Sequence, residues 1–257
     1  MGSKRLTAVV TGATRGIGRA IALKFAENEY VVWALGRNIG DLERVKAEAS
    51  RRGGDVRTLR VDVAERDEVI AACDALLSEV GAPAVLVNNA GIALSSPLTK
   101  TRPEDFDRVM AINAAAPFFF CRELIPAMAA STGGRVINIA STAALKGFKY
   151  TAAYCASKHA LLGLTRALAI EFARKNVTVN AICPGWTETD MLSQSAKAIS
   201  SATGRTVEEA RKILTEMNPM SRLIQPADVA DLCLFLASPG AAAITGAAYP
   251  IDGGEAA

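Results

Sequence analysis

Short hydrophobic runs rich in β-branched residues alternate along the chain with stretches whose apolar residues repeat at helical spacing. The runs predict strands at 6–11, 30–36, 55–61, 84–89, 135–141, 177–182 and 247–251. Between them, amphipathic stretches such as 18–28, 40–52, 66–80 and 104–128 predict helices. We therefore predict an α/β fold: a Rossmann-type doubly wound sheet of about seven parallel strands with helices on both faces and ligands at the carboxyl ends of the strands.

The stretch after the sixth predicted strand breaks this alternation. Roughly forty residues precede the next core-like helix, which is longer than an ordinary connection in a compact domain. Its 207–214 portion predicts a helix. Long excursions after a strand often carry function. We therefore predict a helical substrate lid at about 187–222 on a single domain covering 1–257, and a surface elaboration is the alternative.

Composition and charge narrow the class of protein. The chain has 257 residues, of which 50% are hydrophobic and 21% charged, as expected for one well-packed domain. The net charge of +3 is spread along the chain, so no nucleic-acid partner is predicted. The five cysteines are odd in number and lack a Cys-x-x-Cys pair, which favours reduced thiols, no metal site and a cytoplasmic location.

Two segments bear on whether the protein is exported or crosses a membrane: the N-terminal residues and one apolar run. The N-terminus lacks the apolar segment of a signal peptide, so export is not expected. The most apolar run, 110–121, is shorter than a bilayer span and contains Asn113 and Pro117. We predict a core or subunit-interface helix there and no membrane partner.

A glycine-rich loop, "TGATRGIG", follows the first predicted strand. Gly12 permits a sharp turn, Gly16 lets the backbone approach a pyrophosphate, and Gly18 allows close packing of helix on strand. The start of the next helix supplies N–H donors to the anion. Because glycines also end strands for conformational reasons, the loop alone leaves the cofactor open. The predicted dinucleotide contacts in the loop are Gly12, Thr14, Arg15, Gly16, Ile17 and Gly18.

Two arginines bear on the choice of cofactor. The second predicted strand ends in "LGRN", and Arg37 stands where an NAD site would carry an acidic residue. Arg15 can reach the same position from the glycine loop, so two guanidinium groups suit a 2′-phosphate. NADP(H) is therefore favoured over NAD(H). The alternative is that both arginines are solvated surface charges.

The segment "YCASK" sets a phenol and an amine four residues apart, so Tyr154 and Lys158 lie on one face of the predicted helix and can enter one cavity. Reducing a carbonyl needs a proton donor where alkoxide develops. A phenol titrates near ~10, and an adjacent cation lowers this pKa. We predict that Lys158 lowers the pKa of Tyr154, and that Ser141 at the end of the fifth strand polarises the carbonyl. The alternative is a satisfied buried pair.

Several spaced motifs in this order resemble the short-chain dehydrogenase/reductase family in its single-domain form, across essentially the whole chain. They are "TGATRGIG", "DV" at 62–63, "NNAG" at 88–91, "IN" at 112–113, "IAS" at 139–141, "YCASK", "PGWTETDM" at 184–191 and "PIDGG" at 250–254. The resemblance implies that Asn113, Ser141, Tyr154 and Lys158 are catalytic, with Asn113 supporting a proton relay. It also implies a homotetramer, and cofactor contacts from Asp62, Val63, Asn89, Ala90, Gly91, Tyr154, Lys158, Pro184, Gly185, Thr187 and Thr189.

Within the family the chain is most similar to 3-oxoacyl thioester reductases, including ketoreductases of aromatic polyketide synthesis. The resemblance implies NADPH-dependent reduction of a ketone. The substrate that fits it best is a 3-oxoacyl thioester linked to CoA or to a carrier protein. Oxidation of a hydroxyacyl-CoA, hydroxy acid or cyclic alcohol is an alternative, and a non-catalytic NADP-binding regulatory protein is another. A carrier-protein partner stays open, because Lys175 fits one family docking position whereas Thr132 stands near another. Further basic residues that could meet a pantetheine phosphate are Lys146, Lys149, Arg211 and Lys212.

Overall fold

One seven-stranded parallel sheet forms the centre of the computed structural model, which describes residues 5–257. The strands lie in the order β3-β2-β1-β4-β5-β6-β7. Their bounds are β1 (Thr7–Thr11), β2 (Val31–Gly36), β3 (Asp55–Arg60), β4 (Val85–Asn88), β5 (Gly134–Ile139), β6 (Val177–Pro184) and β7 (Ala248–Ile251). Each predicted strand is confirmed, with ends shifted by two residues or fewer. The order reverses between β1 and β4, the place where doubly wound sheets bind ligands.

The central strands owe their position to unbroken apolar runs. Val10 pairs with Ala34 of β2 on one side and with Val87 of β4 on the other. The strands β4 and β6 are buried along their whole length, as expected for parallel strands covered on both faces. At the edge, β3 places Arg57 and Arg60 in solvent. The hydrophobic pattern thus decided which strands are central.

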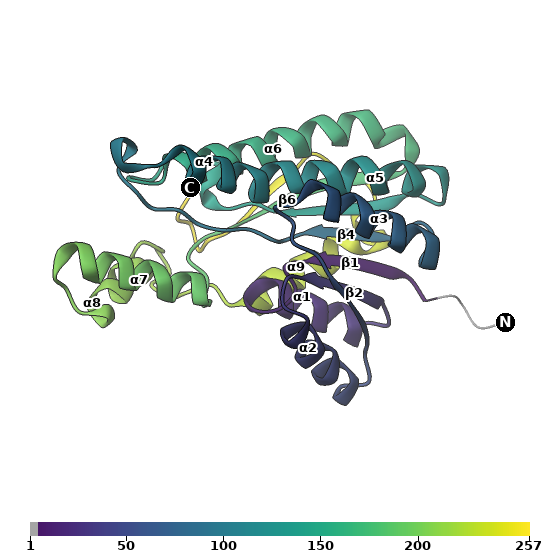
Figure 1. Ribbon diagram of the computed structural model, residues 1–257, viewed down its shortest axis with the longest axis horizontal. Helices are drawn as coiled ribbons and strands as arrows, with labels where there is room; N and C mark the ends of the chain where they lie inside the picture. Colours follow the sequence, from purple (N-terminus) through teal and green to yellow (C-terminus); the bar gives the residue numbers. More distant parts are fainter. Residues whose placement is uncertain (1–4) are drawn as a thin grey trace.

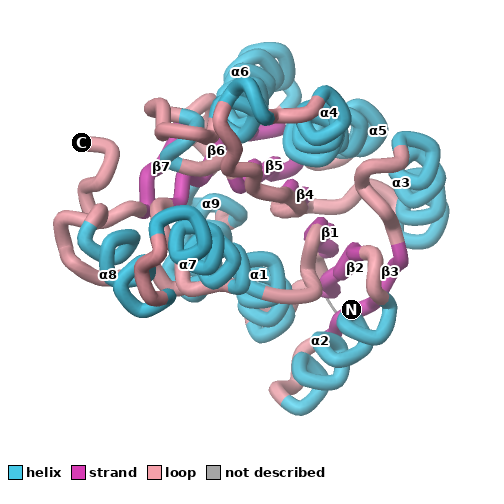
Figure 2. Tube along the Cα trace, turned by 60° about the vertical axis from the view of Figure 1, so that its left-hand side comes forward, coloured by secondary structure: helices cyan, strands magenta, loops and turns pink. Residues whose placement is uncertain are grey.

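Helices cover both faces of the sheet, as Figures 1 and 2 show. On one face, Phe25 of α1 and Leu236 of α9 belong to one core cluster. On the other face, Leu76 of α3 and Leu124 of α5 belong to a second cluster. The first layer holds α1 (Gly16–Glu27), α2 (Ile39–Arg51) and α9 (Pro226–Ala237), and the second holds α3 (Arg66–Val80), α4 (Pro103–Met110), α5 (Ala116–Ala130) and α6 (Ala152–Phe172).

The segment 187–222 stands apart from both layers, at the left of Figure 1 beyond the carboxyl end of β6. It contains α7 (Asp190–Thr203) and α8 (Val207–Glu216), which confirms the helix predicted at 207–214. The two helices share a small core of their own, including Leu192 and Leu214. Residues that flank this segment on either side are bonded to each other, because Ile224 N donates to Trp186 O at 3.0 Å. The excursion is therefore closed at its base.

The helix predicted at 104–128 contains a π-helical turn, Ala111–Ala115, between α4 and α5. By length and composition, this continuous helix, Pro103–Ala130, is the one candidate membrane span in the described part of the chain, with 28 residues and a mean hydropathy of 1.2. Half of its apolar window is buried in the protein, where α4 packs against α6 and α5 against α3. The expectation of no membrane partner stays a prediction.

Candidate active site

The glycine loop turns sharply where β1 reaches the carboxyl edge of the sheet. Gly12 and Gly16 have positive φ angles of 65° and 53°, a region that glycine adopts without steric cost. A Cβ atom on Gly18 would stand 2.2 Å from Gly12 O, so helix α1 packs on the loop more closely than any other residue type would permit. The sharp turn predicted at Gly12 and the close packing predicted at Gly18 match these geometries, and the approach of a pyrophosphate at Gly16 stays a prediction.

The first turn of α1 leaves its N–H groups available to a ligand. Within the described residues, the N-cap residue Arg15 makes no side-chain hydrogen bond to the helix, and the first turn carries no acidic residue. An uncapped helix start, with its partial positive charge, is suited to an anion such as a pyrophosphate. Thr14 and Ile17, also predicted contacts, lie in this loop and in this turn.

The turn after β4 is tied to the glycine loop. Asn89 Nδ2 donates to Thr11 O at 2.9 Å and to Gly12 O at 3.1 Å. In return, Thr11 Oγ1 accepts from Asn89 N and Ala90 N, both at 3.0 Å. The motif "NNAG" thus lies against "TGATRGIG" at the switch between β1 and β4. Thr11 was not predicted, although a polar residue ending an apolar strand is a signal that could have identified it.

The two arginines predicted to face a 2′-phosphate lie on neighbouring segments. A Cβ on Gly36 would stand 2.9 Å from Thr14 Cγ2, so the backbone before Arg37 lies against the side chain of the residue before Arg15. Arg15 Nη1 lies 3.2 Å from Asp190 Oδ2, and Arg37 Nη1 lies 3.9 Å from Asp62 Oδ2. Both guanidinium groups are mostly exposed. They are therefore free to exchange these partners for an anion.

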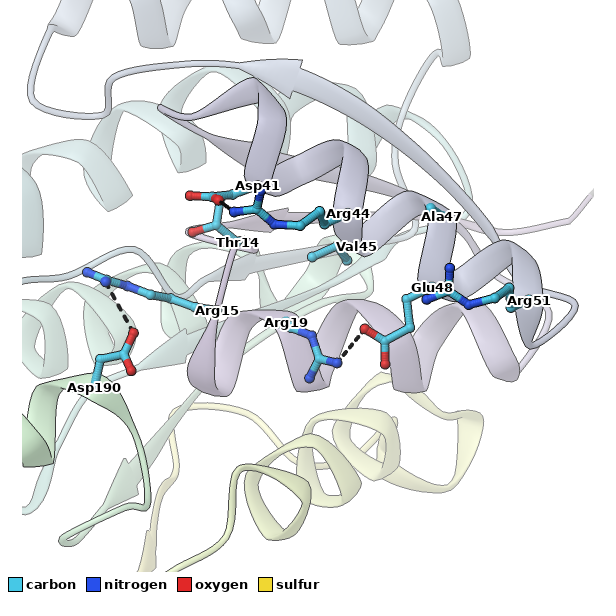
Figure 3. Close-up of a pocket in the computed structure, with 10 residues that line it drawn as sticks. All are labelled: Thr14, Arg15, Arg19, Asp41, Arg44, Val45, Ala47, Glu48, Arg51 and Asp190. Atoms are coloured by element: carbon cyan, nitrogen blue, oxygen red, sulfur yellow. Dashed lines mark hydrogen bonds and ion pairs between the residues drawn. The ribbon is translucent and has the colours of Figure 1, made fainter.

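An open cavity of about 690 Å³ lies beside Arg15, and Figure 3 shows the residues that line it. In this view Arg15 extends from the glycine loop toward Asp190 of α7, and Arg44 of α2 lies near Thr14. Arg44 pairs with Asp41 of its own helix. Neither Arg44 nor Asp190 was predicted, because only the folded chain brings α2 and α7 to the glycine loop. The cavity lining is Thr14, Arg15, Arg19, Asp41, Arg44, Val45, Ala47, Glu48, Arg51 and Asp190.

Other predicted cofactor contacts lie along the same edge. Asp62 follows β3, and its Oδ1 accepts from Ala64 N at 3.0 Å, with Val63 between them. At the other end, Thr189 Cγ2 would lie 3.1 Å from a Cβ on Gly16, so the turn after β6 reaches the glycine loop. Thr187 Oγ1 donates to Gly185 O at 2.9 Å, directly after Pro184. The predicted contacts form one continuous row.

Tyr154 and Lys158 lie on one face of α6, as their spacing predicts. Lys158 is buried, and its Nζ donates to Ile139 O at 2.9 Å, at the end of β5. The same Nζ lies 5.8 Å from the centre of the Tyr154 ring. Burial lowers the pKa of Lys158 to about 8. The amine is therefore fixed by main chain beside the phenol and is close to titrating at neutral pH.

The predicted lowering of the Tyr154 pKa is wrong. Burial raises the pKa of Tyr154, and a side-chain hydrogen bond with Ser141 lowers it by less. Desolvation penalises the phenolate, while the Lys158 ammonium is directed at Ile139 O. Tyr154 is thus a protonated phenol at neutral pH, with Ser141 beside it.

Ser141 lies at the end of β5. Its Oγ accepts from Ala143 N at 3.1 Å, which starts the 3-10 turn Thr142–Ala144. This bond is the ordinary strand-end cap that serine makes. The Ser141 side chain also lies close enough to Tyr154 to lower the pKa of the phenol, so the two hydroxyl groups are neighbours.

Asn113 lies in the π-helical turn and braces the segment after β4. Its Oδ1 accepts from Ile92 N at 2.9 Å, and its Nδ2 donates to Ile92 O at 2.9 Å and to Ser157 Oγ at 3.0 Å. A Cβ on Gly91 would stand 3.3 Å from Asn113 Oδ1 and 3.4 Å from Lys158 Nζ. The backbone of Gly91 therefore separates Asn113 from Lys158, and both amide hydrogens of Asn113 are used within the protein.

A buried polar chain that the sequence did not predict fixes α6 to the sheet. Asn88 Nδ2 donates to Asn138 Oδ1, and Asn138 Nδ2 donates to Thr165 Oγ1, both at 2.9 Å. These residues lie on β4, β5 and α6, and all are buried. The signal was available, since asparagines inside buried strands need partners. This series of hydrogen bonds fixes the rotation of α6, the helix that carries Tyr154, relative to the sheet.

The basic residues predicted to meet a pantetheine phosphate have partners within the protein. Lys146 pairs with Glu255, Arg211 with Glu188 and Lys212 with Glu216. Lys149 lies over the ring of Tyr150. Within residues 5–257 there is also no group of three or more His, Cys, Asp or Glu placed to hold a metal ion.

Comparison with known proteins supports one family. A family model described as Enoyl-(Acyl carrier protein) reductase matches residues 12–255. The chain is 36% identical to D-beta-hydroxybutyrate dehydrogenase of Cupriavidus necator, with 96% of each covered. It is 34% identical to a 3-oxoacyl-acyl-carrier-protein reductase of Pseudomonas aeruginosa, again with 96% of each covered.

Solved structures give the same result. The crystal structure of a variant of actinorhodin polyketide ketoreductase with NADPH matches with a TM-score of 0.95 and 34% identity, and the match covers 100% of this chain and 99% of that one. Fold, motifs and relatives agree from the glycine loop to the end of the chain. The protein belongs to the short-chain dehydrogenase/reductase family and is an oxidoreductase acting on hydroxyl and keto groups with a nicotinamide cofactor.

Proposed function

We propose that the protein reduces a ketone to a secondary alcohol with NADPH, and that its substrate is a 3-oxoacyl thioester. One observation carries the role of the proton donor: the Tyr154 phenol lies beside Ser141 and its raised pKa keeps it protonated at neutral pH. Reduction of a carbonyl consumes a proton at oxygen. A protonated phenol beside a second hydroxyl is the arrangement that this half of the reaction needs.

Each residue has a distinct task in this proposal. Ser141 donates a hydrogen bond to the substrate carbonyl and so polarises it. Tyr154 then transfers its phenolic proton to the developing alkoxide. Lys158, held at Ile139 O, stabilises the phenolate that remains. Asn113 keeps the Gly91 and Ile92 backbone in place beside Lys158.

The residues at the switch point fit a dinucleotide. The glycine loop turns sharply at Gly12, and helix α1 begins at Gly16 without a side-chain cap or an acidic residue in its first turn, so its N–H groups can bind a pyrophosphate. NADPH, when bound, supplies the hydride. Arg15 and Arg37 would bind its 2′-phosphate, because guanidinium groups bind phosphate oxygens through paired hydrogen bonds.

The substrate class rests on what the relatives share. Two printed names, those of a beta-hydroxybutyrate dehydrogenase and a 3-oxoacyl-acyl-carrier-protein reductase, describe oxygen at the third carbon of an acyl chain, and a third names a polyketide ketoreductase. A thioester handle remote from the ketone also provides binding energy that positions the reacting carbon. The segment 187–222 would enclose that handle as a lid.

A second candidate is the oxidative direction with a 3-hydroxy acid, which the relative from Cupriavidus necator favours. Oxidation requires the phenolate of Tyr154 as base. Because burial raises the pKa of Tyr154, this direction should be slow at neutral pH and accelerate at high pH.

The test is consumption of NADPH with acetoacetyl-CoA, a 3-oxoacyl N-acetylcysteamine thioester, a bicyclic ketone and a simple sugar ketone, with NADH as control. We expect the thioesters to be reduced fastest, and with NADPH. Faster turnover of the cyclic ketone would retain the chemistry but reject the thioester. NADPH that binds and is never consumed would support a regulatory protein instead.

We also infer a homotetramer. Phe118, Ala114 and Leu164 line an apolar hollow of about 540 Å³ on the outer side of α4, α5 and α6, and Phe118 is 46% exposed. Apolar patches of this kind mark subunit contacts. Light scattering should give four times the 26.9 kDa chain mass, and Phe118→Asp should reduce it.

A further inference from the structure

Glu255 lies in the turn after β7 with its carboxyl group inside the protein. The side chain is 2% exposed. Asp252 orders this turn, because its Oδ1 accepts from Gly254 N at 3.0 Å and its Oδ2 from Ala256 N at 2.8 Å. A buried carboxyl group is costly unless it is paired. The surroundings of Glu255 therefore need an explanation.

One carboxyl oxygen faces the segment that links Ser141 to α6. Thr142 Oγ1 lies 3.4 Å from Glu255 Oε1, and Lys146 Nζ lies 3.7 Å from the same oxygen. Lys146 Nζ also donates to the main-chain oxygen of Glu255. Thr142 directly follows Ser141, and Lys146 N donates to Thr142 O at 3.0 Å. Glu255 thus contacts both ends of the stretch 142–146.

The far end of this stretch leads to Tyr154. Lys146 O accepts from the thiol of Cys155 at 3.9 Å, and Cys155 is the neighbour of Tyr154 on α6. The stretch 142–146 is therefore bonded to Glu255 on one side and to the first turn of α6 on the other. Ser141 directly precedes the stretch, and Tyr154 directly precedes Cys155, which the stretch contacts.

The second carboxyl oxygen faces the turn after β6. A Cβ on Gly185 would stand 2.8 Å from Glu255 Oε2, so glycine is needed there for the carboxyl group to fit. Among the described residues Oε2 has no hydrogen-bond partner. Burial raises the pKa of Glu255, and Lys146 lowers it by less. Such an unfavourable environment indicates a role other than stability.

We propose that Glu255 is a positioning residue of the active site, which holds the Ser141 segment at a fixed separation from the Gly185 turn. The inference rests on the proposed function, because it matters only if Ser141 and Tyr154 meet a substrate whose other side faces that turn. Reaction rates depend steeply on such separations, since a misplacement of about 1 Å can cost roughly a hundredfold.

The kinetic test compares Glu255→Ala, Glu255→Gln, Lys146→Met and the Glu255→Ala/Lys146→Met double variant, with Glu79→Ala as control. Glu79 is an exposed glutamate at the end of α3 that pairs with Arg57. We expect Glu255→Ala to lower kcat about tenfold while KM for NADPH stays within about twofold. Glu255→Gln should recover most of kcat, because its amide oxygen accepts from Thr142 and Lys146.

The double variant tests whether Glu255 acts through Lys146. Residues that act through one contact give non-additive effects. The double variant should therefore be no slower than Glu255→Ala. Wild-type kcat in Glu255→Ala, or multiplied losses in the double variant, would overturn the proposal. If Glu255→Ala does not fold, Lys146→Met and Thr142→Val carry the test, and unchanged kcat in both overturns it.

A second readout does not depend on turnover. Trp186 follows Gly185 and is partly buried, and the other tryptophan, Trp33, can be replaced by phenylalanine. In that background, Glu255→Ala should make Trp186 more accessible to acrylamide quenching, and Glu255→Gln should not. An unchanged quenching constant overturns the proposal. If the wild-type protein reduces no ketone, the proposed function fails, while the response of Trp186 still decides whether Glu255 holds the Gly185 turn.

Discussion

The centre of the proposed active site and its phosphate-binding rim are built in different ways. In the centre, Lys158 is 4% exposed and Asn113 is 1% exposed, and both bond to main-chain atoms of other elements. At the rim, the side chains of Arg15, Arg37 and Asp190 are 67%, 57% and 65% exposed. Side-chain geometry is thus fixed where chemistry takes place, whereas the rim consists of exchangeable ion pairs.

This contrast has an energetic reason. A buried polar group keeps its position because leaving its partner costs the full desolvation penalty. An exposed ion pair contributes little and is screened by salt, so it can give way to a phosphate. Substitutions in the centre should therefore have large effects on kcat, and substitutions at the rim should have smaller effects on cofactor binding.

The largest expected effect is that of Tyr154→Phe. The ring remains packed while the proton donor is lost, so kcat should fall about a thousandfold, within the range for general acids, with little change in NADPH affinity. Steady-state kinetics and fluorescence titration of NADPH measure the two quantities. Tyr30→Phe, which removes a phenol hydroxyl at the opposite edge of the sheet, is the control. Unchanged kcat in Tyr154→Phe would reject the proposed acid.

Lys158→Met should lower kcat about a hundredfold and abolish the dependence of kcat on pH that Lys158 gives the wild type. The ammonium is lost as the pH rises through about 8, so kcat for reduction in the wild type should decline above that value. The variant should show a flat profile there. A wild-type profile without this decline would place the charge of Lys158 outside the reaction.

The same residue gives a stability prediction of defined sign. Burial lowers the pKa of Lys158 to about 8 in the folded protein, so the unfolded chain binds the proton more tightly. The free energy of unfolding of the wild type should then rise as the pH increases above about 8, and that of Lys158→Met should not show this rise. Urea denaturation at several pH values measures this difference, and equal slopes would contradict it.

Gly18→Ala should weaken NADPH binding more than tenfold. The new Cβ would meet Gly12 O at 2.2 Å and Asn89 Nδ2 at 2.3 Å, so the glycine loop must move. Gly163→Ala is the matched control, because among the described residues nothing lies within 4 Å of its Cβ. In a helix interior that control should gain about 0.5–1 kcal/mol of stability. Equal NADPH affinity in the two variants would show that the loop is not the pyrophosphate site.

Arg37→Ala should weaken NADPH binding about tenfold and NADH binding much less. A charge-assisted hydrogen bond contributes on the order of 1.5–3 kcal/mol, and exposure favours the lower end. Titration with each cofactor at two salt concentrations separates the effects. An equal loss for both cofactors would remove Arg37 from the 2′-phosphate.

Asp190→Asn should have the smallest effect. Asp190 competes with the phosphate for Arg15, and an exposed ion pair contributes at most about 1 kcal/mol. NADPH should therefore bind up to about fivefold more tightly in the variant. A loss of affinity instead would show that Asp190 orients Arg15 and does not compete for it.

Much of the fold could be predicted because the pattern is local. Mostly apolar, β-branched runs such as 84–89 and 177–182 became the fully buried strands β4 and β6, and the spacing of Tyr154 and Lys158 placed them on one helical face. The glycine spacing predicted the sharp turn at Gly12. Each of these predictions depends on residues within a few positions of one another, where backbone sterics and periodicity decide the outcome.

Contacts between residues that are far apart in the sequence could not be predicted from such local patterns. The pKa of Tyr154 was predicted with the wrong sign, because desolvation depends on how completely the fold covers α6. The partners Asn138 and Thr165, or Arg15 and Asp190, are separated by many residues, and no pattern pairs them.

The sequence by itself determined the alternation of strand and helix, the glycine turns and the shared face of Tyr154 and Lys158, since these follow from chain geometry over a few residues. Only the tertiary structure decided that Lys158 points to Ile139 O, that Tyr154 keeps its proton, and that Glu255 fills the space beside Gly185. Burial and hydrogen-bond geometry are properties of packed surfaces, and those surfaces exist only after segments distant in sequence have met.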